Sequence, residues 1–96
     1  MSIPVRVSGV ERVMIIQWGQ PTLPTSPSTI SFSVPFPTAC LVVICNDAST
    51  GGAGNGFVIA SQDWNATSFS ARAYVAGSTA EAVGGAGGIN YIAIGY

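Results

Sequence analysis

Polar and apolar residues alternate with a period of two along much of this chain, which is the repeat of a β-strand with one face against a core. Two segments, Thr29–Phe36 and Thr67–Val75, show the alternation clearly. In the first segment we expect the apolar positions to face the core: Ile30, Phe32, Val34 and Phe36. In the second segment the positions opposite the core-facing set are more polar: Ser68, Ser70, Arg72 and Tyr74. Both segments are therefore predicted to be strands.

The segment Glu11–Gly19 (ERVMIIQWG) differs because both of its faces are largely apolar. One face carries Arg12, Met14, Ile16 and Trp18, and the other carries Val13, Ile15 and Gln17. A strand of this kind is expected in the middle of a sheet that is covered on both sides, here by the core and by another subunit.

Further short apolar segments predict the remaining strands: Cys40–Asn46, Gly56–Ser61, Ile89–Tyr96 and, as an edge strand that tolerates Pro4, Ile3–Val7. The connections between strands are rich in proline or glycine: Pro21–Pro27, Asp47–Asn55 and Ala76–Gly88. The one helix candidate, around Ser78–Val83, is too short and too closely flanked by glycine to form a helix. Six or seven short strands at this spacing predict an all-β fold, a small antiparallel β-sandwich that forms one domain over residues 1–96.

Charge is scarce in this chain. It has three basic and four acidic residues, so 7% of its residues are charged against 48% that are hydrophobic, whereas soluble domains carry about 25% charged residues. A small domain has much surface per unit of volume, so we expect part of this surface to lie against identical copies or a neighbouring segment. The same composition excludes intrinsic disorder. The few basic residues exclude a nucleic-acid partner, and the lack of a long uninterrupted apolar run excludes membrane insertion.

The chain also lacks the residues that most catalytic and metal sites need. It contains no histidine and no lysine, so neither a Ser-His-Asp arrangement nor a Schiff-base lysine can form. Cys40 and Cys45, five positions apart in one strand, are expected to point to opposite faces and to act as small buried hydrophobes. We therefore expect that the protein has no metal site, binds no cofactor and is not an enzyme. Four carboxylates could in principle form a glycosidase-like pair, but nothing in the sequence brings two of them together: Glu11, Asp47, Asp63 and Glu81.

The remaining chemistry is suited to recognition. Asp63, Trp64 and Asn65 lie at a predicted turn, where an exposed tryptophan flanked by polar groups can stack on a sugar or anchor a protein. Arg72 and Tyr74 on the polar face of the following strand are candidates to extend this patch. The alternative is that Trp64 folds back onto the core and its neighbours are only turn residues. Asn55, in the Gly-rich loop Asp47–Asn55, is a further candidate contact.

Three motifs, in order, resemble a known family. They are Ile15–Gly19 (IIQWG), Ser31–Cys40 (SFSVPFPTAC) and Tyr91–Tyr96 (YIAIGY), and together they are similar to the C-terminal domain of phage tail-fibre proteins of the gp53-like type. The resemblance runs from Val13 to Tyr96, but the central part, Asp47–Gly88, matches no motif, so no binding residue is carried over. It implies a trimeric β-sandwich at the distal end of a virion fibre, produced in the bacterial cytoplasm, as a fragment whose shaft precedes residue 1.

The sequence thus predicts the receptor-binding tip of a phage or prophage tail fibre, which contacts host polysaccharide, lipopolysaccharide or an outer-membrane protein. We expect a homotrimer with Met14, Ile16 and Trp18 near the interface and the loops Asp47–Asn55, Asp63–Ala66 and Ala76–Gly88 toward the host. Two alternatives remain: a structural cap that joins three chains without binding a receptor, and a small polysaccharide depolymerase.

Overall fold

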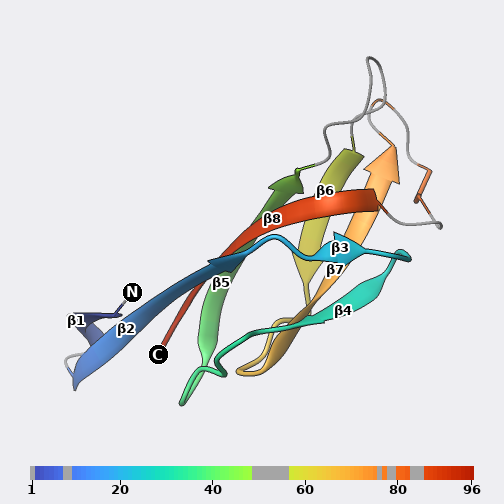
Figure 1. Cartoon of the computed structure of the whole chain (residues 1–96). Coiled ribbons are helices and arrows are strands. Elements are labelled where there is room, and N and C mark those ends of the chain that lie inside the picture. Colours follow the sequence, from blue (N-terminus) through green and yellow to red (C-terminus); the bar gives the residue numbers. More distant parts are fainter. Residues whose placement is uncertain (1, 8–9, 49–56, 76, 78–79, 83–85) are drawn as a thin grey trace.

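The computed structural model of the chain describes residues 2–7, 10–48, 57–75, 77, 80–82 and 86–96 (Figure 1). These residues form eight strands and no helix, so none of them belongs to a helix that could cross a membrane. The strands are β1 (Ser2–Val7), β2 (Val10–Gly19), β3 (Thr22–Leu23), β4 (Ser28–Ser31), β5 (Cys40–Asp47), β6 (Phe57–Gln62), β7 (Ser68–Val75) and β8 (Ala86–Gly95). The all-β prediction is confirmed. The additional strand is β3, which lies inside the segment Pro21–Pro27 that we expected to be a connection.

The larger sheet is built around β8. Strand β5 pairs with one edge of β8 over most of its length. Along the other edge, β2 pairs with Tyr91–Gly95, and β3 pairs with the start of β8. The first half of β2 pairs only with β1, and this hairpin lies at one end of the molecule (Figure 1). All these pairs are antiparallel.

The smaller sheet has the order β4-β7-β6, with β7 in the centre. It packs against the larger sheet across one core, as Figure 1 shows for β8 in front of β6 and β7. The alternation in β7 puts Phe69, Ala71 and Ala73 on the inner face, and all three are fully buried. The same alternation in β8 buries a second set: Ile89, Tyr91 and Ala93. The ring centroids of Phe69 and Tyr91 lie 5.1 Å apart, so an edge-to-face aromatic contact joins the two sheets.

The expected strand Thr29–Phe36 is shorter than the sequence pattern indicated. Strand β4 ends at Ser31, and Val34, which we expected in the core, is 60% exposed. Phe32 and Phe36 are buried as expected, but they are held by backbone hydrogen bonds to the turn before β7, from Phe32 N to Thr67 O and from Phe36 N to Ala66 O. The chain between the two phenylalanines therefore loops outward. The pattern was misleading because two buried residues four positions apart fit a strand and an anchored loop equally well.

The two cysteines also depart from expectation. A shift in register between Cys40 and Val42 changes the alternation within β5, so Cys40 pairs with Gly95 and Cys45 pairs with Tyr91, both on the inner face. The prediction that the thiols point to opposite faces is wrong. Both cysteines are nevertheless free and pack in or against the core, as predicted for small hydrophobes. Burial raises the pKa of Cys40 and raises that of Cys45 to about 11.

Candidate functional surfaces

The outer face of the larger sheet carries residues from three neighbouring strands in matching positions. Since paired residues on adjacent strands point to the same side of a sheet, the registers of β2 and β5 with β8 define two apolar rows. A third row follows from the pairing of Asn46 with Asn90 and from the hydrogen bond, 2.8 Å long, that Gln20 Nε2 donates to Asn90 Oδ1. The rows are Ile16–Ile94–Val42, Trp18–Ile92–Ile44 and Gln20–Asn90–Asn46. We call these nine residues the outer face.

Two properties distinguish the outer face. None of its nine residues is charged. Its middle row is strongly exposed, with 64% of Trp18, 62% of Ile44 and 48% of Ile92 accessible to solvent. A contiguous apolar surface of this kind on a small domain marks a site of interaction.

The predicted interface residues Met14, Ile16 and Trp18 share one side of β2, opposite the side that faces the core. On the inner side Ile15 packs against the core, and Gln17 Nε2 donates to the carbonyl oxygen of Val34 at 2.7 Å. None of the predicted interface residues lies on β5 or β8. The sequence does contain a feature that indicates an apolar outer face on β8, because the segment Ile89–Tyr96, like Glu11–Gly19, has largely apolar residues on both faces.

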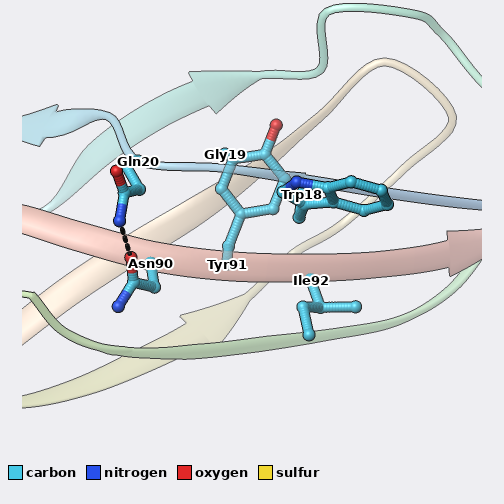
Figure 2. A pocket seen from close by; sticks show the side chains of 6 residues that line it. All are labelled: Trp18, Gly19, Gln20, Asn90, Tyr91 and Ile92. Carbon is cyan, nitrogen blue, oxygen red and sulfur yellow. Dashed lines mark hydrogen bonds between the residues drawn. The ribbon is translucent and has the colours of Figure 1, made fainter.

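A shallow hollow of about 640 Å³ opens at the edge of the outer face (Figure 2). It is lined by Trp18, Gly19, Gln20, Asn90, Tyr91 and Ile92. A side chain at position 19 would lie 2.9 Å from Cε1 of Tyr91, so glycine lets that ring pack close to β2. The hollow offers an indole, an aliphatic side chain and two amides. It can contact apolar groups and exchange hydrogen bonds, and Tyr91 adds a phenol ring to its lining.

The predicted recognition turn contains Asp63, Trp64 and Asn65, between β6 and β7. Asp63 adopts a positive φ of 52°, which a tight turn favours for this residue type. Asn65 Oδ1 accepts hydrogen bonds from Thr67 N, Thr67 Oγ1 and Ser68 N, at 2.8, 2.8 and 3.0 Å. Asn65 thus has the structural role that we considered as the alternative. Trp64 is 38% exposed, so part of its indole is available to a partner.

The other predicted contacts, Arg72 and Tyr74, lie near the far end of β7. Arg72 and Tyr74 lie four and six positions beyond Ser68, the first residue of β7, which corresponds to about 13 and 20 Å of strand, so neither lies in the turn that holds Trp64. Arg72 Nη1 forms an ion pair with Glu81 Oε1 at 2.9 Å. Asn55 lies outside the described residues, as do large parts of the loops Asp47–Asn55 and Ala76–Gly88.

Within the described residues, no group of three histidine, cysteine, aspartate or glutamate side chains is placed to hold a metal ion. Two of the carboxylates serve the fold. Asp47 Oδ2 accepts a hydrogen bond from Phe57 N at 3.1 Å, which links β5 to the start of β6. Glu81 Oε2 accepts a hydrogen bond from Ser26 Oγ at 2.5 Å, in addition to its ion pair.

The described strands thus form an antiparallel sandwich whose larger sheet has an exposed, uncharged outer face. Residues 12–96 match the family described as tail fiber protein gp53-like, C-terminal, and the chain belongs to that family. The Escherichia coli (strain K12) protein StfP is 34% identical over 101 residues, and that match covers all of this chain and 44% of StfP. The chain thus spans less than half of this relative.

Two solved structures share the fold. The C-terminal part of the P. aeruginosa R2 pyocin fibre superposes with a TM-score of 0.66 and 26% identity, over 86% of this chain and 21% of that one. An R1-type pyocin tail fibre superposes with a TM-score of 0.60 and 21% identity, over 100% of this chain and 86% of that one. Both structures support the fold, and the R2 pyocin fibre also connects the sandwich to tail fibres.

Proposed function

We propose that this domain is the receptor-binding tip of a phage or prophage tail fibre and attaches the particle to a bacterial surface. Membership of a tail-fibre family and similarity to pyocin fibres support the fibre role. The observation that carries the proposal is the exposed outer face. In this proposal, copies of the domain meet at the outer face, and the smaller sheet and the loops contact the host. The domain would lie in the virion, at the distal end of the fibre.

The proposed assembly is a homotrimer. Met14, Ile16 and Trp18 lie on one side of β2 and are the contacts we place near the interface. Three copies that bury this side would remove from water the apolar surface that a single domain leaves exposed. Such an assembly would leave less apolar surface for the seven charged residues to keep in solution.

The proposed host ligand is a surface polysaccharide, lipopolysaccharide or an outer-membrane protein, bound without being cleaved. Trp64 at the β6–β7 turn is the best-placed candidate contact because its indole is partly exposed on a turn that Asn65 fixes. A preorganised turn loses little conformational entropy when it binds. Asp63 belongs to the same turn, whereas Asn55, Arg72 and Tyr74 would belong to separate contacts.

A direct test is a binding screen on bacterial strains with defined surface polysaccharides. The chain has no lysine, so an amine-reactive dye labels only its amino terminus and leaves the candidate surfaces unmodified. We expect adsorption to some strains and not to others, loss of adsorption for Trp64→Ala without a lower melting temperature, and full adsorption for Val34→Ala, an exposed loop residue in a different place. Adsorption that is unchanged in Trp64→Ala would contradict this contact, and release of reducing ends from the polysaccharide would contradict a non-enzymatic role.

The structural cap remains a second candidate because a specific observation favours it. The amide and carbonyl groups of Tyr96 bond to the backbone of Thr38 and Ala39, so the last strand is firmly tied into the fold next to the outer face. A domain that only holds three chains together would form trimers and adsorb to no strain.

A further inference from the structure

The outer face is divided into layers of different chemistry. Its first two rows are apolar, and its third row consists only of the amides Gln20, Asn90 and Asn46. The amide row crosses the sheet from Gln20, directly after β2, through β8 to β5, at right angles to the strands. Within the part of the chain that the structure describes, the Asn46 side chain makes no hydrogen bond, although its neighbour Asn90 accepts one from Gln20.

We infer that the whole outer face, and not β2 alone, is the contact between copies of this chain, and that the amide row fixes the register of that contact. The inference rests on the proposed homotrimer and extends it to β5 and β8. It identifies the occupant of the face as a second and third copy of the same domain.

Two observations favour identical copies over another partner. The face has no charge, so identical copies meet without repulsion, whereas a charged partner would leave its own charges unpaired there. Each amide side chain also carries both donors and acceptors. The amide row is therefore complementary to itself, which a surface of only donors or only acceptors would not be.

The arrangement of the rows explains how they would set the register. Suppose that three copies turn this face toward a common axis that runs along the strands. Each row then meets the same row of the other two copies and forms one layer of the contact. The third layer contains nine amides, three from each copy. A slip by one row, about 7 Å along the strands, would place these amides against Trp18, Ile92 and Ile44. Buried amides without partners are disfavoured, so the slipped assembly is less stable. A polar layer in an otherwise apolar contact fixes register and oligomeric state in coiled coils in the same way.

The position of the contact can be tested with a matched pair of variants. Ile44 and Val58 lie on edge strands of different sheets, and their exposed fractions are 62% and 58%. By sedimentation velocity on the 96-residue chain, we expect Ile44→Asp to weaken association at least about a hundredfold, because a charge would be buried without a partner. Val58→Asp should associate as the unchanged chain does. Equal behaviour of the two variants would overturn the inference about the face.

The role of the amide row can be tested with Asn90→Val and Asn46→Val, which keep a residue suited to a strand and remove the amide. We expect both variants to associate at least as strongly as the unchanged chain, but to form several species in native mass spectrometry where the unchanged chain forms one. A single trimeric species for both variants would overturn the role in register. Circular dichroism establishes that each variant is folded.

These outcomes separate this inference from the proposed function. A monomeric unchanged chain at micromolar concentration would overturn the homotrimer and the interface together. A trimer that Ile44→Asp leaves intact would overturn the interface alone. If Trp18→Ala and Asn90→Val remain trimeric but no longer adsorb to cells, the outer face is a ligand site and the inference is wrong.

Discussion

We expect the substitution Gly95→Ala to lower the stability of the fold strongly, although it adds only one methyl group. Gly95 is buried at the end of β8 and pairs with both Ile15 and Cys40. A methyl group at this position would overlap the carbonyl oxygen of Ala39 and would lie 2.7 Å from Cδ1 of Phe36. The phenylalanine ring is itself buried, and the Ala39 carbonyl is part of the backbone, so neither group can move away without disturbing its own contacts.

The loss of unfolding free energy in Gly95→Ala follows from the hydrogen bonds that break when the Ala39 carbonyl moves away from the added methyl group. Ala39 O accepts a hydrogen bond from Tyr96 N at 2.9 Å, and Tyr96 O accepts bonds from Thr38 N and Ala39 N, both at 2.7 Å. Each such bond contributes about 1 kcal/mol net, so the loss of two or three, with some loss of packing around Phe36, lowers the free energy of unfolding by about 2–4 kcal/mol. For a domain of this size the melting temperature should fall by roughly 10–25 °C.

Thermal unfolding followed by circular dichroism measures this effect. All samples need the same protein concentration, because association makes the melting temperature depend on concentration. Gly88→Ala is the matched control, since it lies in the same strand and the added methyl group would meet only Ala48 Cβ at 3.8 Å, an ordinary contact. If Gly95→Ala melted within a few degrees of Gly88→Ala, the steric reasoning would be refuted.

Three further predictions concern buried or bonded polar groups. Ser26→Ala should lower the unfolding free energy by about 1–3 kcal/mol in urea titrations, because Ala73 N and Glu81 both lose their bond to the buried Ser26 hydroxyl. Asn65→Ala should lower the melting temperature and Asn65→Asp should largely preserve it, since Asp keeps the oxygen that accepts three hydrogen bonds. Burial raises the pKa of Cys45 to about 11, whereas unfolding exposes a thiol of ordinary pKa. The unfolded chain therefore loses the thiol proton first as the pH rises, so the contribution of Cys45 to stability is complete below pH 9 and declines toward pH 11. The unfolding free energy of Cys45→Ala should fall less steeply over that interval.

The sequence was sufficient to predict the fold class and the approximate position of most strands. The reason is physical: β7 is buried on one side and solvated on the other, so its alternation of Phe69, Ala71 and Ala73 with polar residues is direct evidence of a strand. The prediction failed where the backbone departs from regular alternation. The bulge after Cys40 and the loop around Val34 are set by hydrogen bonds to distant parts of the chain, and no local pattern encodes those partners.

The candidate surfaces could be predicted only in part, for a related reason. The period of two predicts that Met14, Ile16 and Trp18 share one face of β2. Only the register of β2 and β5 against β8 shows that Ile44 and Ile92 extend this face onto the neighbouring strands. The grouping of Trp64 with Arg72 and Tyr74 in one patch stays a prediction: Trp64 lies in the turn before β7, whereas Arg72 and Tyr74 lie farther along that strand.

The contrast between the two sheets gives the strongest reason to place assembly on the larger one. Opposite its buried side, β7 presents Ser68, Ser70, Arg72 and Tyr74, which water can solvate without cost. Opposite their buried sides, β2 and β8 present tryptophan and isoleucine. An antiparallel sheet that faced water would not need apolar residues on both sides. A chain with so few charges that puts mostly polar residues on one outer face and apolar residues on the other has two different outer surfaces, and the apolar one is the surface on which we propose that copies of the chain meet.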